Sequence, residues 1–190
     1  MPNDPVLQQL IASAQVLGLQ NDPSLPASDR QILRMADEEK RALSPAEIQQ
    51  ICQSSKVDAQ LIEQLQGNAN HLVQQAREFL LREQPHLVQP GGALFPSERA
   101  EACWRDCWQF FRVIVYAIAC KQDQFTDPEG MGALLALYAH VGVPIEGLNI
   151  ALKRLKVLSE QEVSGAIEAQ LLSDSFMHLL KELNKTAVKY

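Results

Sequence analysis

The run Cys103-Trp104-Arg105-Asp106 places a thiol, a guanidinium and a carboxylate within one turn of an expected helix. Asp106 follows Cys103 by one turn, so both side chains share a helix face, whereas Arg105 is rotated by about 100° from Asp106 and points along the flank. Arg99, one turn before Cys103, adds a second guanidinium. These groups suit a flat, conjugated ligand with acidic substituents, because thiols add to vinyl-type carbons and guanidiniums pair with carboxylates. The same spacing occurs more often as a solvent-exposed Arg–Asp pair beside a buried cysteine than as a ligand site.

The other patterns in the chain point to no catalytic or metal chemistry. Cys103 and Cys107 share a helix face, but no second pair of ligands accompanies them. The four histidines also lack metal-ligand spacing: His71, His86, His140 and His178. No GxSxG, Walker or Rossmann motif is present. We therefore expect a binding protein without a metal, and not an enzyme.

The composition narrows the class of partner. Lys and Arg number 17 against 23 Asp and Glu, a net charge of −6, which argues against a nucleic-acid binder or a protein that binds anionic membranes. The longest apolar run, residues 113–120, is far shorter than the roughly 20 residues that a transmembrane helix needs. Hydrophobic residues at 46% predict a self-sufficient core. We expect the four cysteines to be reduced, as in a cytoplasmic protein.

Helical periodicity runs through nearly every segment, which predicts an all-α protein of eight or nine helices. A long helix over residues 97–121 carries the Cys103 group and follows an irregular stretch at residues 85–96. Capping boxes are expected at Ser44 with Glu47 and at Ser159 with Glu162. The lengths suit globin-like packing better than a four-helix bundle. The other expected helices cover residues 5–18, 28–43, 45 onward, 58–65, 68–83, 128–141, 144–156 and 159–184.

Four sequence blocks, in order, resemble the phycobiliproteins, the light-harvesting subunits of phycobilisomes. ACWRDCWQFFRVIVYAIAC, residues 102–120, is similar to their chromophore-bearing helix. ADEEKRALSPAEI (36–48) resembles their N-terminal hairpin, REQPHLVQPGGALF (82–95) their Pro-Gly-Gly loop, and LYAHVGVPIEGLNIALKRLK (137–156) a later helix start. The residues of the first block on the family pattern are Cys103, Arg105, Asp106, Phe110, Arg112 and Tyr116.

This resemblance implies a globin-like fold with an N-terminal helical hairpin and an additional N-terminal helix. Residues 1–27 would be a helical extension and linker, and residues 28–190 the globin domain. It also implies a linear tetrapyrrole, a bilin of the phycocyanobilin type, attached through a thioether to Cys103. Asp106 would bind the inner pyrrole nitrogens, and Arg105 and Arg99 would hold the propionates. The expected location is the cytoplasm, at the cytoplasmic face of the thylakoid.

Departures from the family pattern predict a divergent or minor subunit. Gln109 and Ala42 stand where tyrosines are usual, and Ala93 stands where β-type subunits carry a methylated asparagine. Asp37 and Arg112 keep charges that the family uses across the contact between α and β subunits. We expect pairing with other phycobiliprotein-like subunits, and a homodimer or monomer when the chain is alone. Two alternatives stay open: a non-covalent bilin carrier or scavenger, and a pigment-free interaction or sensory globin.

Overall fold

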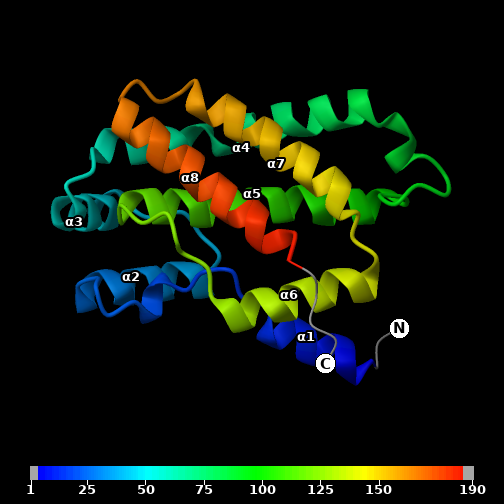
Figure 1. Cartoon of the computed structure of the whole chain (residues 1–190), viewed down its shortest axis with the longest axis horizontal. Coiled ribbons are helices and arrows are strands. Elements are labelled where there is room, and N and C mark those ends of the chain that lie inside the picture. Colours follow the sequence, from blue (N-terminus) through cyan, green and yellow to red (C-terminus); the bar gives the residue numbers. More distant parts are fainter. Residues whose placement is uncertain (1–3, 186–190) are drawn as a thin grey trace.

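The structure, a computed structural model, describes residues 4–185 as an all-α protein (Figure 1). No strand occurs in that range, which confirms the expected fold class. The described helices are α1 (Pro5–Ser13), η1 (Leu19–Asn21), α2 (Ala27–Glu38), α3 (Pro45–Ser55), α4 (Ala59–Glu83), η2 (Pro85–Val88), α5 (Ser97–Ala119), α6 (Pro128–Val141), α7 (Ile145–Glu160) and α8 (Ala166–Leu183), η marking 3-10 helices.

Helix α5 is the axis of the fold. In Figure 1 it crosses the middle of the molecule, with α4 and α7 above it, α2, α1 and α6 below it, and α8 passing diagonally across it. Its second half, residues 113–120, is buried on every face, as its continuous apolar sequence requires. Its first half is buried on one side only, so Glu101 and Arg105 remain exposed. That half is therefore the part of α5 that can border a site.

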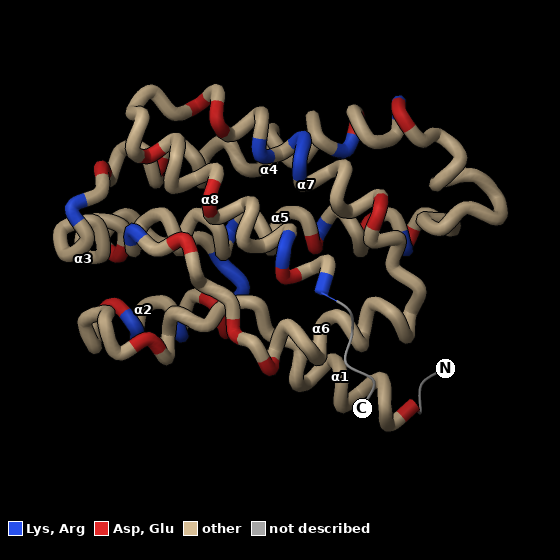
Figure 2. The backbone as a smooth tube through the Cα atoms, viewed as in Figure 1, with Lys and Arg blue, Asp and Glu red and all other residues tan. Residues whose placement is uncertain are grey.

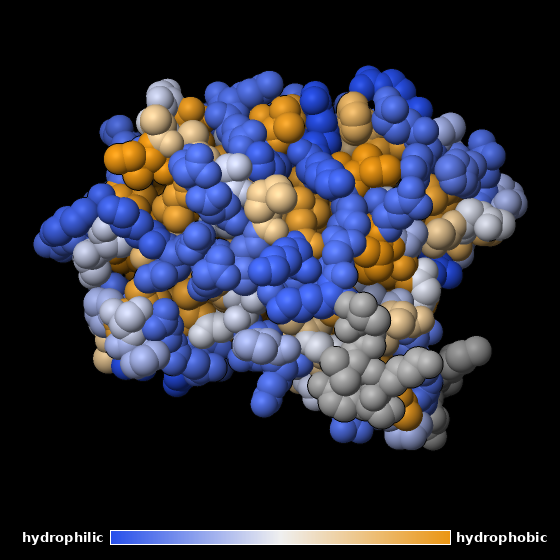
Figure 3. Space-filling view, viewed as in Figure 1, coloured by the Kyte–Doolittle hydropathy of each residue, from blue (hydrophilic) through white to orange (hydrophobic). Residues whose placement is uncertain are grey.

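The outer surface is polar and mixed in charge. Basic and acidic residues are interspersed over the helices (Figure 2). On the face seen in Figure 3, hydrophilic side chains separate several apolar patches from one another. Within residues 4–185, no helix combines the length and apolar character needed to cross a bilayer.

The additional N-terminal helix ends earlier than its periodicity predicts, at Ser13 instead of residue 18. The following residues are extended because they pair with the segment that leads into α6. Gly18 N donates to Phe125 O at 2.7 Å, and Asp127 N donates to Val16 O at 2.9 Å. A Cβ on Gly18 would lie 2.8 Å from backbone atoms of Thr126, so this close approach requires glycine.

The linker after α1 contributes to the main core. Leu17 is fully buried and Leu19 is 2% exposed, in the same hydrophobic cluster as α5. Helix α1 itself buries no residue completely and packs on α6. Residues 17–27 are thus attached to the globin body more firmly than α1 is.

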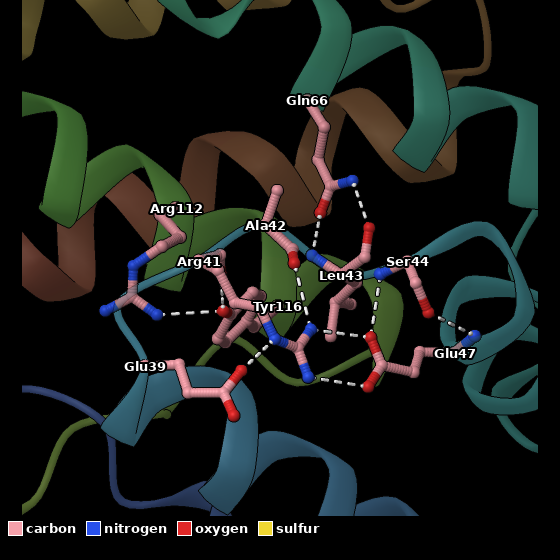
Figure 4. A network of polar contacts seen from close by, with 9 residues as sticks. All are labelled: Glu39, Arg41, Ala42, Leu43, Ser44, Glu47, Gln66, Arg112 and Tyr116. Atoms are coloured by element: carbon pink, nitrogen blue, oxygen red, sulfur yellow. Dashed lines mark hydrogen bonds and ion pairs between the residues drawn. The ribbon is translucent and has the colours of Figure 1, made fainter.

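The N-terminal hairpin, α2 and α3, is fastened to α5 by a network of polar contacts, part of which is drawn in Figure 4. Arg112 Nη2 lies 2.6 Å from Asp37 Oδ1, and Arg112 Nη1 donates to Tyr116 Oη at 2.8 Å. Tyr116 Oη donates to the carbonyl of Arg41, whose guanidinium pairs with Glu47 at 2.7 Å. Asp37 and Arg112 therefore neutralise each other within one chain.

One expected helix start is confirmed and another is wrong. Ser44 and Glu47 form the reciprocal capping box that opens α3. Ser159 instead continues α7, because its hydroxyl donates to the Leu155 carbonyl one turn back at 2.7 Å. Glu162 accepts from Asn68 Nδ2 at 2.7 Å, so α8 begins later, at Ala166.

Two other boundaries also differ from the expected ones. Helix α4 runs unbroken through Gly67, where two helices were expected, because a single glycine costs a helix only about 1 kcal/mol. Helix α2 ends at Glu38 instead of residue 43 because Lys40 takes a left-handed conformation with φ of 52°.

Candidate functional site

A cleft of about 310 Å³ opens beside the first half of α5. Three segments that are distant in sequence form it: α5, the loop before α5, and the joint between α6 and α7. The cleft is lined by Ala93, Leu94, Glu98, Arg99, Ala102, Cys103, Asp106, Val141, Val143 and Pro144. The walls are mostly apolar, and the charged groups come from α5. This volume is at the lower end of the range for small-molecule sites, so a large ligand would extend beyond the mouth.

Glycines shape two walls of the cleft. Gly91 has φ of 88°, and a Cβ on Gly92 would lie 2.2 Å from the His86 carbonyl oxygen. The Pro-Gly-Gly turn therefore folds back closely on η2, which places the next residues along the cleft. At the opposite wall, Gly142 ends α6 in the left-handed conformation with φ of 71°, and Val143 N donates to Tyr138 O at 2.9 Å.

Cys103 lies in the cleft as a nearly buried thiol, 7% exposed. The Cys107 thiol, one turn further on, interacts with the Cys103 thiol and lowers the pKa of Cys103, although burial and the charge of Asp106 act in the opposite direction. The same interaction, together with burial, raises the pKa of Cys107. Of these two thiols, Cys103 is the one that lines the cleft, so it is the one that a ligand there can reach.

Asp106 presents a desolvated carboxyl group to the same cleft. Burial raises its pKa, and this effect outweighs the hydrogen bond from Tyr138 and the charge of Arg105, both of which lower it. Tyr138 Oη, from α6, donates to Asp106 Oδ2 at 2.9 Å. The charged form of Asp106 is thus under-stabilised in the protein, and N–H donors on a ligand would compensate it.

Arg99 stands at the rim of the cleft. Its Nη2 donates to the carbonyls of Val141 and Gly142, both at 2.8 Å. These are free carbonyls at the C-terminal end of α6, which attract a cation. A guanidinium has five N–H donors, so Arg99 keeps donors for a ligand carboxylate while it holds α5 to α6.

The structure does not place Arg105 in the cleft. Two residues correspond to about 200° of helix rotation, so Arg105 is nearly opposite Cys103 on α5. It is exposed and borders a separate groove with Trp104 and Trp108. It is rotated by only about 60° from Ala102, which does line the cleft. The structure thus brings together Cys103, Asp106 and Arg99, with Arg105 on the adjoining outer surface.

Sequence reasoning missed the partners that come from outside α5. Tyr138 lies within the block LYAHVGVP, but nothing in its local pattern indicates that its hydroxyl reaches Asp106. The same holds for the apolar walls at Leu94 and Val143. The signal that points to these segments is the family resemblance of residues 82–95, 102–120 and 137–156, because these three blocks contain the three segments that form the cleft.

Comparison with known proteins places this geometry in context. A family model described as phycobilisome protein matches residues 31–183. Allophycocyanin subunit beta-18 of Nostoc sp. is 31% identical over 126 residues, 65% of this chain and 75% of that protein. Allophycocyanin alpha chain 1 of Microchaete diplosiphon is 31% identical over 138 residues, 71% of this chain and 86% of that protein.

A solved structure shares the fold. It is a far-red fluorescent biliprotein derived from a far-red induced allophycocyanin F subunit of the cyanobacterium Chroococcidiopsis thermalis. The TM-score is 0.60 at 21% identity, over 67% of this chain and 96% of that chain. This likeness confirms the expected globin-like all-α fold.

Proposed function

The chain belongs to the phycobilisome protein family, and we propose that it is a bilin-binding, light-harvesting-related subunit of that family. The observation that carries the proposal is the cleft, where a nearly buried thiol, a desolvated carboxyl group and a guanidinium converge on one apolar space. These are the groups that a conjugated, N–H-rich and acid-bearing pigment requires. When bound, such a pigment supplies light absorption.

We propose Cys103 as the point of covalent attachment. The thiol adds across a vinyl-type carbon–carbon double bond of a phycocyanobilin-type bilin, sulfur bonding to one carbon and the proton going to the other. The addition balances without an oxidant and without a leaving group. Its place in the wall of the cleft supports this role, and the neighbouring Cys107 thiol lowers the pKa of Cys103, which favours the reactive thiolate.

Asp106 is proposed to hold the inner ring nitrogens. Its carboxylate would accept hydrogen bonds from N–H groups and favour a protonated, cationic chromophore, since an opposite charge nearby stabilises the charged form. Tyr138 fixes the carboxylate by donating to Oδ2 at 2.9 Å. Held at the thiol and along its nitrogens, the bilin would be kept extended, so the protein acts as a rigid mount and not as an enzyme.

Arg99 and Arg105 would bind the bilin propionates on different sides of α5. Arg99 is at the cleft rim, so a propionate can meet it without rearrangement. Arg105 is on the outer surface of α5, so it would meet only a propionate that leaves the cleft. This difference predicts a larger loss of pigment affinity for Arg99→Gln than for Arg105→Gln.

A second candidate function is a non-covalent bilin carrier. The observation that favours it is the low exposure of Cys103, 7%, which restricts access of a double bond to the sulfur. In that case the same cleft would hold the bilin through Asp106 and Arg99 alone. Both functions fit a cytoplasmic protein that pairs with other phycobiliprotein-like subunits, or that is a homodimer or monomer when alone.

Co-expression with a bilin-producing pathway tests the proposal. We expect coloured protein that keeps zinc-enhanced fluorescence in a denaturing gel, and we expect Cys103→Ala to lose that fluorescence. Cys120→Ala is the matched control because Cys120 is also buried but directly follows the far end of α5, and this variant should keep the pigment. Colour that is lost in acid would favour the carrier, and a colourless protein would contradict both.

A further inference from the structure

A second groove, of about 300 Å³, lies between α4 and α5 on the side of α5 away from the cleft. Each helix contributes four residues at the spacing i, i+3, i+4 and i+7, which is one continuous helix face. From α5 these are Glu101, Trp104, Arg105 and Trp108. From α4 they are Asn70, Val73, Gln74 and Arg77. Two parallel rows of side chains thus border a channel long enough for about two turns of a third helix.

The residue types in this groove are those of an interaction surface. Both tryptophans of the chain, Trp104 and Trp108, lie here, and Trp108 is only partly buried. Trp104 is 6% exposed, yet its indole N–H has no hydrogen-bond partner in the described part of the chain. The guanidinium of Arg77 lies 5.4 Å from the Trp104 ring centroid. Tryptophan and arginine dominate the energetic centres of protein interfaces.

The charges at the outer edge of the groove are self-complementary. Glu101 and Arg105 are one helical turn apart, and the Glu101 side chain is 64% exposed. Glu101 pairs loosely with Arg77 at 3.3 Å. Arg105 is exposed and takes part in none of the ion pairs found within residues 4–185. An acidic and a basic residue on one helix face match the same face of a second, antiparallel helix.

We propose that this groove is a two-fold interface with a second copy of the chain, in which α5 packs antiparallel against α5. The symmetry places Glu101 of each copy opposite Arg105 of the other, so two identical ion pairs form across the axis. The groove residues Trp104 and Trp108 are then covered from both sides. The cleft takes no part in this interface. The two proposals share only Arg105, which in the proposed function would meet a propionate that leaves the cleft.

Charge reversal tests this interface on the full chain produced without a bilin supply, so that no propionate competes for Arg105. Sedimentation velocity should find a dimer of the parent chain at about 100 μM, a weak-to-moderate affinity range. E101R and R105E should each raise the dissociation constant about tenfold or more, because like charges then face each other. An equimolar mixture of the two variants should dimerise again, as should the double variant.

The matched control is Lys153→Glu, a charge reversal at an exposed position on α7, which should leave the dimer intact. Tryptophan emission gives a second readout, since both tryptophans line the groove: dilution should shift it to the red in the parent and not in either single variant. Circular dichroism verifies that the variants fold. A parent that stays monomeric, single variants that dimerise like the parent, or a mixture that stays monomeric would each overturn the proposal.

Discussion

Replacing Arg112 by methionine should destabilise the protein strongly, because it leaves the Asp37 carboxylate buried without its main partner. The two side chains are 4% and 10% exposed and their charged atoms are 2.6 Å apart. Removing one member of such a buried pair costs about 3–5 kcal/mol. Lys40 remains 3.3 Å from Asp37 but is itself 56% exposed, so we expect the lower part of that range, about 3 kcal/mol. Arg112 also donates to Tyr116 on the same helix, so the variant loses a contact that orients the Tyr116 hydroxyl toward the Arg41 carbonyl.

Urea unfolding followed by far-UV circular dichroism measures this effect. Asp37→Asn should cost a similar amount, and the double variant with Arg112→Met should cost less than the sum, because no unpaired charge is then left buried. Arg34→Met is the matched control: this arginine is exposed on α2, and its replacement should change stability by less than about 0.5 kcal/mol. A loss below about 1 kcal/mol for Arg112→Met would refute the view that this pair holds the hairpin on α5.

Three further predictions concern the site and the N-terminal extension. Burial raises the folded-state pKa of Asp106 above its ordinary 3.8, so the protein loses stability as pH rises through that folded pKa. Asp106→Asn should therefore be more stable than the parent at neutral pH and no more stable below pH 3.8. Urea unfolding at the two pH values measures this difference. Leu17→Ala should lower the free energy of unfolding by about 2–5 kcal/mol because Leu17 is fully buried. Deleting residues 1–13 should lower it by less, since α1 buries no residue completely. Thermal unfolding of both variants compares the two effects. Gly92→Ala should lower both the thermal midpoint and bilin uptake, because its Cβ would lie 2.2 Å from the His86 carbonyl.

Local signals predicted those parts of the fold that local interactions decide. The capping box at Ser44 and the apolar run of α5 each need only their own neighbours, and both are present as expected. Ser159 has the same local signature as Ser44, but its hydroxyl has an alternative acceptor in the preceding turn, and Glu162 has partners on α4. A capping pattern is therefore ambiguous where long-range partners compete for its residues.

The candidate site likewise contains residues that helix spacing predicts and a contact that it does not predict. Helix spacing places Cys103, Asp106 and Arg99 along one side of α5, and the cleft contains all three. The same spacing already put Arg105 on another side of the helix, although the family resemblance grouped it with them. Tyr138 could not be predicted, because its contact with Asp106 joins two helices across a separation of 32 residues.

Mass spectrometry of the denatured chain, purified after co-expression with a bilin pathway, is the direct test of bilin attachment at Cys103. We predict that the intact mass increases by one bilin and that peptide mapping finds the bilin on the peptide containing Cys103. The parent mass without any addition, or a bilin on Cys52, Cys107 or Cys120 instead, would contradict it.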